Sequence, residues 1–466
     1  SSGINAEYMG DMAGVQMARL RAILALLFCV SSLKGGCASD REGDGGRRST
    51  VAALDSPAAA NSFPPGSSLT VIPTSESVGA GETQGSDHLR GGSIKSRLAS
   101  VKARRLASGG FKVTTLTVKS GESIGAPSYF VDSKIGTPSR KFSLAFDTGS
   151  DLTWVQCLPC KTCYTQADPV FDPAKSSTFQ RVRCGSKICS SLAYRNGCFG
   201  TSCAYEVDYN DGSVTKGVVG NDVLVLGRDT VKNFLLGCGH NNTGTFNGTA
   251  GVLGLGQGSS SLLSRTASMY RNVFSYCLPC SGVGYLTLGA TGGNSSDTVY
   301  AKLATTARSP NYFIRLLKIM VGNRDLRIDP SVFTYGLTVD SATTLTSIPP
   351  TAYASLKKAF RTGMRKQTLV RSTNPLFDTC YDLSRYSSTA KSGFPVITLV
   401  FEGNAAVNMT ATGTFTGDTM KEQCLAFVGN SIDQSAGILG NLQQATYGLS
   451  IDVKGKQLGF TKNGCT

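Results

Sequence analysis

Histidine and tryptophan are almost absent from this chain, and the shortage of histidine excludes several kinds of chemistry. The sequence holds 2 histidines and 1 tryptophan among 466 residues. A serine or cysteine nucleophile usually needs a histidine base, and His240, the one histidine beyond residue 114, has no Gly-x-Ser-x-Gly elbow to serve. The run Cys157-Leu-Pro-Cys160-Lys-Thr-Cys163 has zinc-like spacing but lacks histidine partners. We therefore expect no metal or other cofactor.

Charge and long apolar runs are also scarce. Charged residues make up 17% of the chain, whereas glycine is abundant at 54 residues. Short β-type runs broken by glycine begin near Thr114, and this pattern predicts an all-β sandwich or barrel class. The best helical stretch is 351–366, which follows Pro349-Pro350, with Thr351 as its expected N-cap.

The first 37 residues have the layout of a secretory signal. A short basic stretch begins at Met17, and residues 22–30 are nine consecutive apolar residues followed by small ones. We expect translation to start at Met17 and residues 1–16 to be a leader. The chain is predicted to be secreted or vacuolar.

Residues 38–114 are rich in Ser, Gly, Ala and Pro and read as a weakly ordered prosegment. The basic cluster from Lys95 to Arg105 lies near its end, and Arg104-Arg105 is a candidate processing site. We expect this prosegment to act as an intramolecular inhibitor. The remaining chain divides into 115–305 and 306–466.

Thirteen cysteines follow residue 114, which in an exported chain predicts a disulfide framework. The odd number leaves one thiol, and Cys280 is its expected position because it lies three residues from Cys277. The other expected disulfide cysteines are Cys157, Cys160, Cys163, Cys184, Cys189, Cys198, Cys203, Cys238, Cys277, Cys380, Cys424 and Cys465. Sequons at Asn241, Asn247, Asn294 and Asn408 predict glycosylation.

The net charge of +15 is spread along the chain rather than concentrated. A diffuse positive field can bind polyanions without specificity, but the sequence has no recognisable nucleic-acid module. Nonspecific nucleic-acid binding is therefore a secondary hypothesis for this chain.

An internal repeat is the most informative feature. Leu144-Ala-Phe-Asp147-Thr-Gly149-Ser recurs as Leu337-Thr-Val-Asp340-Ser-Ala342-Thr. Each copy is followed about a hundred residues later by two apolar residues and a glycine, at 252–254 and 438–440. Two lobes of similar build, each contributing one acidic loop, are predicted to meet across a cleft.

Such a pair of loops supports hydrolysis by two carboxylates. Facing carboxylates cannot both stay ionised, so they share one proton. The ionised member takes a proton from a bound water, and the protonated member hydrogen-bonds to the carbonyl that the water attacks. Backbone N–H groups can approach the carboxylates where the third residue is small, and the hydroxyls of Thr148 and Ser341 can join one loop to the other.

The stretch Phe146-Asp-Thr-Gly-Ser-Asp-Leu-Thr-Trp154-Val-Gln-Cys157 resembles the first active-site signature of pepsin-like aspartic peptidases. It looks most like the plant nepenthesin-like group, and within it the branch described as chloroplast-nucleoid DNA-binding aspartic peptidases. Tyr209-Asn-Asp-Gly-Ser213, Gly237-Cys-Gly239, Phe274-Ser-Tyr-Cys277, Phe377-Asp-Thr-Cys380 and Ile438-Leu-Gly-Asn441 extend the match from about Thr115 to the C-terminus. The branch name also makes a chloroplast location conceivable, although the leader argues against it.

The resemblance implies an all-β, bilobal fold with two pseudo-twofold-related β-barrel lobes. It implies an aspartic endopeptidase, made as a zymogen and active in acid as a monomer on polypeptide substrates. Asp147 and Asp340 would be its catalytic pair, and Tyr209 would lie on a flap supported by Trp154. Cys380 and Cys424 would form a disulfide, and residues 157–203 a disulfide-stapled insertion. The wider site would include the flap residues Asp211, Gly212 and Ser213 and the loop residues Thr148, Gly149, Ser150, Ser341, Ala342 and Thr343.

Four positions depart from the family pattern. Ala342 stands where the family has glycine, and a Cβ there would be strained if the backbone needed positive φ. Asn210 replaces a flap glycine, while Asp132 and Lys134 replace apolar or glycine residues. Ala342 motivates an alternative hypothesis, in which the chain is a weakened or inactive binding or inhibitor-like protein on the same fold.

Overall fold

The computed structural model describes residues 111–280, 282–292, 295–304, 311–386, 393–445 and 447–464. The predicted signal, most of the predicted prosegment and the predicted boundary at 305/306 lie outside these residues, as do Asn294 and Cys465. In the described part, no helix is long and apolar enough to span a membrane.

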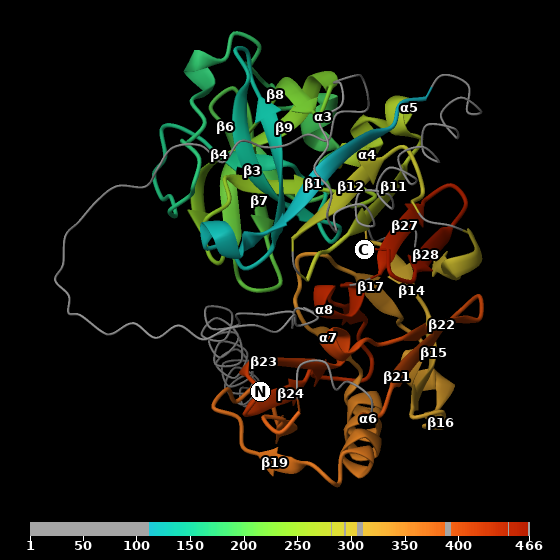
Figure 1. The fold of residues 1–466 in the computed structure, drawn as a ribbon. Helices are drawn as coiled ribbons and strands as arrows, with labels where there is room; N and C mark the ends of the chain where they lie inside the picture. Colours follow the sequence, from blue (N-terminus) through green and yellow to red (C-terminus); the bar gives the residue numbers. More distant parts are fainter. Residues whose placement is uncertain are drawn as a thin grey trace, which may run out of the picture.

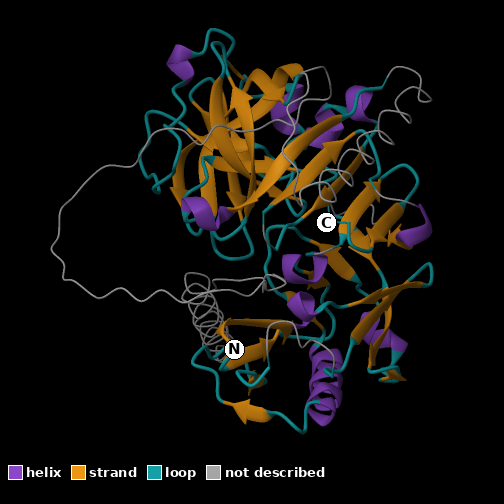
Figure 2. Cartoon of the chain, in the orientation of Figure 1, coloured by secondary structure: helices purple, strands orange, loops and turns teal. Residues whose placement is uncertain are grey.

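The described chain is built mainly from strands, with short helices at the loops (Figure 2). The strands up to residue 304 are β1 (Thr114–Ser120), β2 (Tyr129–Ile135), β3 (Arg140–Asp147), β4 (Trp154–Gln156), β5 (Gln180–Arg181), β6 (Arg195–Phe199), β7 (Ser202–Asp208), β8 (Val214–Leu226), β9 (Asp229–Thr243), β10 (Gly251–Gly254), β11 (Val273–Cys277), β12 (Val283–Leu288) and β13 (Thr298–Ala304).

The later strands are β14 (Phe313–Ile314), β15 (Leu316–Val321), β16 (Arg324–Asp325), β17 (Leu337–Val339), β18 (Thr346–Ile348), β19 (Thr368–Val370), β20 (Cys380–Asp382), β21 (Ile397–Phe401), β22 (Ala405–Asn408), β23 (Phe415–Thr419), β24 (Glu422–Leu425), β25 (Phe427–Gly429), β26 (Gly437–Leu439), β27 (Gly448–Asp452) and β28 (Gln457–Thr461). The helices are α3 (Lys187–Ser190), α4 (Leu262–Arg265), α5 (Ala267–Tyr270), α6 (Pro350–Gly363), α7 (Ala411–Thr414) and α8 (Asn441–Gln444), with 3-10 turns η1 (Gly121–Ile124), η2 (Pro173–Lys175), η3 (Ser295–Asp297) and η4 (Pro330–Phe333).

Two β lobes follow one another along the chain and are joined by a shared sheet (Figure 1). Strand β11 pairs antiparallel with β27, and β13 pairs antiparallel with β28, so the neighbouring strands β27 and β28 lie between two strands of the first half. Apolar residues occupy every second position of these strands, for example Leu449 and Ile451 opposite Phe460 and Leu458. The apolar side chains therefore lie on one face of each strand, where they are buried. The bilobal all-β fold is thus the one that the sequence predicts.

The repeat forms the same motif in both lobes. In the first, β3 runs parallel to β10, with Asp147 opposite Gly254. In the second, β17 runs parallel to β26, with Val339 opposite Leu439. The first pair of parallel strands ends at Asp147 and Gly254, and the second pair is followed directly by Asp340 and Gly440.

The hydrophobic core crosses the junction between the lobes. The ring of Phe146 meets that of Tyr276 at 5.6 Å, Tyr276 stacks on Phe274, and Phe274 contacts Tyr312 at 5.8 Å. All four rings are fully buried, and burial of an aromatic ring is worth about 2–3 kcal/mol. The row of aromatic rings therefore makes the packing of the two lobes continuous.

Helix α6 begins one residue before the sequence predicts, and Thr351 is not its N-cap. The cap position is Pro349, which has no side-chain hydrogen bond to offer. Asp433 supplies the missing acceptor, because its Oδ1 accepts a 2.9 Å bond from Thr351 N. A distant loop thus does the capping that local sequence assigned to Thr351.

The disulfides confirm the predicted Cys380–Cys424 pair and correct the prediction for Cys280. Cys280 is itself disulfide-bonded, as is Cys277, so it is not the leftover thiol. A spacing of three residues does not prevent pairing: in the Cys160–Cys163 disulfide the Cα atoms lie 6.0 Å apart, within the usual range. The other pairs are Cys157–Cys238, Cys184–Cys198, Cys189–Cys203 and Cys380–Cys424.

Asp132, an unusual residue for its strand, is accommodated by partners. Its side chain is buried, accepts a 2.9 Å hydrogen bond from Ser143 Oγ and pairs with Lys119 Nζ at 3.2 Å. Lys134 on the same strand is exposed. Strand β2 therefore accommodates both charged residues, since Asp132 has buried partners and Lys134 is exposed.

Candidate active site

The two aspartates of the repeat converge where β3 and β17 end. A methyl group placed on Gly149 would lie 3.1 Å from Asp147 Oδ1 and 3.0 Å from Asp340 Oδ2. Both carboxylates therefore border one small volume beside Gly149. A side chain there would crowd them, so close approach rather than an unusual φ requires glycine at this position.

Backbone and hydroxyl donors hold each carboxylate. Gly149 N donates to Asp147 Oδ1 at 2.7 Å. Asp340 Oδ1 accepts from Ala342 N at 2.8 Å and from Thr343 N at 3.0 Å. Thr343 Oγ1 donates to Asp340 Oδ2 at 2.8 Å. The two lobes thus hold their carboxylates by the backbone N–H two residues later, and Thr343 adds two further donors on the Asp340 side.

Ala342 carries no left-handed strain. It does not occur among the non-glycine residues with positive φ, and its N–H reaches Asp340 as a glycine N–H would. Asn210 is also outside that group, and the left-handed turn of its hairpin is made by Gly212 at φ 82°. The backbone strain considered for these two departures is therefore not present.

Thr148 and Ser341 join the two loops reciprocally. Thr148 N donates to Ser341 Oγ at 3.1 Å, and Ser341 N donates to Thr148 Oγ1 at 3.0 Å. The two hydroxyls then donate onward to Val339 O and Phe146 O, each on the opposite lobe's strand. All these groups are buried, so the four bonds are shielded from water.

The electrostatics of the pair favour one shared proton. Burial and, after it, the negative charge of Asp340 raise the pKa of Asp147 to about 7. A carboxyl with this pKa is protonated in acid and about half ionised in neutral water. The pair can therefore hold one proton while the other member is ionised, which is the condition for general acid–base work.

A hairpin from β7 and β8 brings Tyr209 to the site. Trp154 Nε1 donates to the Tyr209 hydroxyl at 2.8 Å. Burial and the charge of Asp147 raise the pKa of Tyr209 well above its ordinary value. The Tyr209 hydroxyl therefore lies close enough to Asp147 to interact with its charge. In the turn, Asp211 accepts from Ser213 N at 2.9 Å, and Gly212 N donates to Tyr209 O.

Two aromatic rings that sequence reasoning missed support Trp154. Phe246 meets its ring at 5.0 Å and Tyr164 at 6.5 Å, both edge to face. Phe246 also contacts Tyr209 at 5.3 Å. Trp154 is fully buried, so it serves as a core residue and as a hydrogen-bond donor to the hairpin.

Amide side chains of α8 hold the Asp340 loop, and sequence reasoning missed them too. Gln444 Nε2 donates to Asp340 O at 2.8 Å, and Asn441 Nδ2 donates to Ser341 O at 3.2 Å. Tyr276 of the first lobe donates to Gln444 Oε1 at 2.6 Å. The run Asn-Leu-Gln-Gln after the second apolar-apolar-Gly triplet was the available signal.

The remaining predicted residues lie at different distances from the carboxylates. Ser150 is half-buried, its side chain opposes the rise in the pKa of Asp147, and its carbonyl accepts a hydrogen bond from Gly256 N at 2.8 Å. His240 contacts the carbonyl of Pro159 through Nδ1 at 3.0 Å. Of the sequon asparagines, Asn247 and Asn408 are exposed and Asn241 is half-buried.

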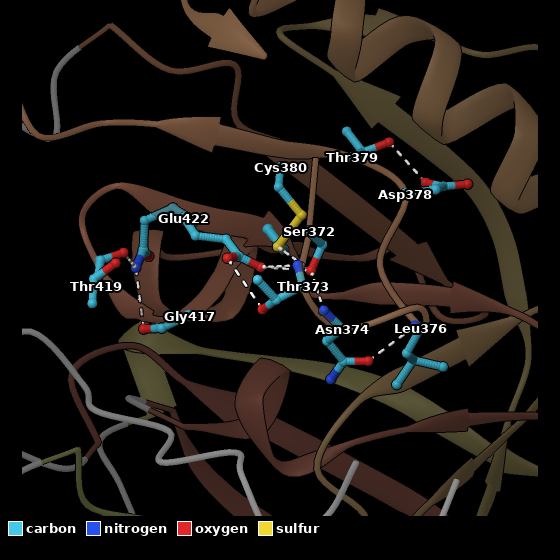
Figure 3. The surroundings of a disulfide bond; sticks show 12 residues. Ser372, Thr373, Asn374, Leu376, Asp378, Thr379, Cys380, Gly417, Thr419 and Glu422 are labelled. Atoms are coloured by element: carbon cyan, nitrogen blue, oxygen red, sulfur yellow. Dashed lines mark hydrogen bonds between the residues drawn. A yellow bond between two sulfur atoms is a disulfide. The ribbon is translucent and has the colours of Figure 1, made fainter. Parts of the chain in front are cut away.

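Among the described residues, one group has the composition of a metal site, namely Cys380, Glu422 and Cys424. Figure 3 shows its surroundings. Both sulfurs are joined in the disulfide, and Glu422 Oε1 accepts hydrogen bonds from Ser372 Oγ and Thr373 N. These atoms are engaged in structure and fit no metal ion.

The family models that match this chain are described as Xylanase inhibitor N-terminal, over residues 129–290, and Xylanase inhibitor C-terminal, over 311–462. Aspartyl protease AED1 of Arabidopsis thaliana is 38% identical over 387 residues, covering 81% of this chain and 80% of the relative. Aspartic proteinase nepenthesin-1 of Nepenthes gracilis is 32% identical over 358 residues, covering 73% and 79%.

Solved structures show the same fold at lower identity. Basic 7S globulin from soybean aligns with a TM-score of 0.61 and 20% identity, over 75% of this chain and 96% of that one. Conglutin gamma from lupine seeds aligns with a TM-score of 0.60 and 23% identity, over 75% and 95%. With the paired aspartates and the named relatives, the conclusion is that this chain belongs to the plant pepsin-like aspartic peptidases.

Proposed function

We propose that this chain is an active aspartic endopeptidase that works in acid. One observation carries the proposal: a buried Asp147 with a pKa of about 7 shares one small volume with Asp340, and both accept the hydrogen bonds that fix them. The substrates would be polypeptides, as the names of the relatives imply for their own family.

The reaction would use the two carboxyls in opposite roles. Asp147 carries the shared proton because its pKa is raised by burial and by Asp340, and it donates a hydrogen bond to the substrate carbonyl. Asp340, as the ionised partner, takes a proton from the water that attacks the same carbon. The proton then passes to the leaving nitrogen as the tetrahedral intermediate breaks down. No other nucleophile is required.

The Tyr209 hairpin would close over the bound peptide. The Tyr209 hydroxyl is held by Trp154, and the base of the hairpin is joined to the loop after β9 because Thr245 N donates to Ser213 Oγ at 2.9 Å. A hairpin fixed at its base can exclude water from the carboxylates when substrate is present. That exclusion strengthens the electrostatic interactions inside the site.

Synthesis as a zymogen belongs to the same proposal. The basic residues before Arg105 would cover an acidic cleft until removed, and Arg104-Arg105 would mark the processing region. The disulfides support folding in an oxidising compartment, so we propose a secreted or vacuolar protein. The monomeric state is part of this proposal.

The test is cleavage of an unfolded protein by the purified chain, before and after removal of the prosegment, between pH 2 and 6. We expect pepstatin-sensitive cleavage that is lost in Asp147→Asn and Asp340→Asn. Tyr335→Phe, a change at an exposed position, is the matched control and should retain activity. Absence of pepstatin-sensitive cleavage in the processed wild-type chain would refute the proposal.

A binding or inhibitor-like protein is the second candidate. The observations behind it are Ala342 in place of the family's glycine and the description of the matching family models as xylanase inhibitors. The two candidates differ in what Ala342→Gly does. A chain that gains activity at least a hundredfold from this change would be an impaired peptidase in its natural form.

A further inference from the structure

The loop after β10, residues 254–258, closes over a carboxyl group that the catalytic pair does not use. Its sequence is Gly-Leu-Gly-Gln-Gly, and it lies against Asp151 on the active-site loop. Gly258 N donates to Asp151 Oδ1 at 2.8 Å. Leu255 N donates to Asp147 O at 2.8 Å, so the same loop holds the backbone of a catalytic residue.

The three glycines of this loop permit that contact. A methyl group on Gly254 would lie 2.3 Å from the backbone oxygen of Asp151. On Gly256 it would lie 2.3 Å from Asp151 Oδ1, and on Gly258 2.1 Å from Oδ2. Real Cβ atoms do not approach so closely. Glycine is therefore needed at 254, 256 and 258 because a side chain at any of these positions would overlap Asp151. Asp151 itself is buried, at 7% exposed.

The other side of the 254–258 loop is held by the second lobe. Tyr312 donates its hydroxyl hydrogen to Leu255 O at 2.6 Å, and Gln257 Nε2 donates to Asn311 O at 2.8 Å. Tyr312 O in turn accepts from Val339 N at 2.8 Å. Val339 is the residue directly before Asp340, so the chain of contacts ends at the second catalytic aspartate.

We propose that Asp151 and Tyr312, with the 254–258 loop held between them, form a second connection between the lobes that positions Asp147 relative to Asp340. This Asp151–Tyr312 bracket is separate from the Thr148–Ser341 bonds and reaches the pair from the side of β10 and β14. Asp151 and Tyr312 are positioning residues, because they act on the carboxylates through the backbone. The kinetic readout of this inference rests on the proposed peptidase function.

The bracket includes a group that titrates. Burial raises the pKa of Asp151 to about 6, and its hydrogen bond from Gly258 opposes that shift. Asp147, Tyr194 and Tyr312 each interact electrostatically with Asp151. None of these is cationic, and ionised Asp151 raises the pKa of Asp147. The second lobe holds Asp340 with the neutral amide of Gln444 instead.

Two substitutions test the bracket against a matched control. Tyr312→Phe removes only the hydroxyl that donates to Leu255 O. Tyr447→Phe removes a comparable buried hydroxyl, which donates to Asn408 O at 2.6 Å in the second lobe. We expect kcat to fall about tenfold in Tyr312→Phe with KM within twofold, because the misplaced pair loses transition-state geometry rather than substrate binding. Tyr447→Phe should keep the wild-type kcat.

Asp151→Asn supplies a readout that does not depend on turnover. The variant keeps an acceptor for Gly258 N but cannot ionise, so the pKa of Asp147 should fall. Carboxyl-carbon NMR of aspartate-labelled protein measures this pKa directly, whether or not the chain is a peptidase. Titration of Asp147 unchanged in Asp151→Asn, together with equal kcat in the two tyrosine variants, would overturn the bracket. A wild-type chain without activity would instead refute the proposed function and leave the NMR test decisive.

Discussion

Thr148 and Ser341 exchange hydrogen bonds across the junction of the lobes, each N–H donating to the other's hydroxyl at 3.1 and 3.0 Å. Ser341→Ala removes an acceptor for Thr148 N and a donor to Phe146 O. Because a buried donor left unpaired costs about 1–3 kcal/mol, we expect the free energy of unfolding to fall by about that amount. Urea denaturation measures it.

The control for that change is Thr148→Ser, which keeps the hydroxyl and loses one methyl. It should retain most of the stability and activity. If Ser341→Ala unfolds at the same urea concentration as the wild type, the exchanged bonds contribute nothing and the prediction is wrong.

Stability should depend on pH through the raised carboxyls. Burial raises the pKa of Asp147 to about 7 and that of Asp151 to about 6, against an ordinary value of 3.8. The folded state thus binds more protons than the unfolded state between these limits. Its free energy of unfolding falls as pH rises from about 4 to about 7. The expected loss is on the order of a few kcal/mol.

Urea titrations at pH 4, 5.5 and 7 check this slope. The double variant Asp147→Asn/Asp151→Asn has no such carboxyls and should show a flatter dependence. A wild-type chain whose stability rises over this interval would contradict the sign of both shifts.

Positions 149 and 342 should differ in how strongly a change of one methyl group affects catalysis. Gly149→Ala puts a methyl 3.0 Å from Asp340 Oδ2, so kcat should fall by about a hundredfold as the carboxylates are displaced. Ala342→Gly relieves no left-handed φ, and its N–H already donates to Asp340. We expect its kcat/KM to stay within about threefold of the wild type. Steady-state cleavage of one peptide by both variants makes the comparison.

Trp154→Phe should remove the hydrogen bond that supports the Tyr209 hairpin while leaving an aromatic ring in the core. The phenylalanine keeps contacts with Phe246 but cannot donate to the Tyr209 hydroxyl. We expect kcat/KM to fall about tenfold, since a buried partner loses a hydrogen bond worth about 1 kcal/mol and the hairpin loses its support. A double-mutant cycle with Tyr209→Phe measures the coupling, and additive effects would mean that the Trp154–Tyr209 bond has no role in catalysis.

The sequence predicted the parts of the site that repeat along the chain. Asp147 and Asp340 could be found because each lies in a similar segment with a matching apolar-apolar-Gly triplet. This spacing can be read directly from the sequence. The two lobes also followed from this repeat, whereas the β-barrel form of the lobes and the Cys380–Cys424 pair came from resemblance to a family. All of these features depend on patterns of residues that can be recognised along one sequence.

Contacts between distant loops could not be predicted in the same way. The capping of α6 by Asp433, the support of Asp340 by Gln444 and the contact of Tyr312 with Leu255 each join segments that no local pattern relates. The backbone angle of Ala342 likewise depends on the folded loop. The error at Cys280 arose from treating a three-residue spacing as a geometric obstacle.

The shared sheet of the junction also sets an order of events during synthesis. Strand β11 completes its pairing with β27, and β13 with β28, which ends at Thr461. A chain synthesised only as far as the first lobe lacks these partners, so β11 and β13 cannot complete their pairing although Asp147 has already been made. The peptidase we propose would therefore assemble its catalytic pair only once the residues through Thr461 have been synthesised.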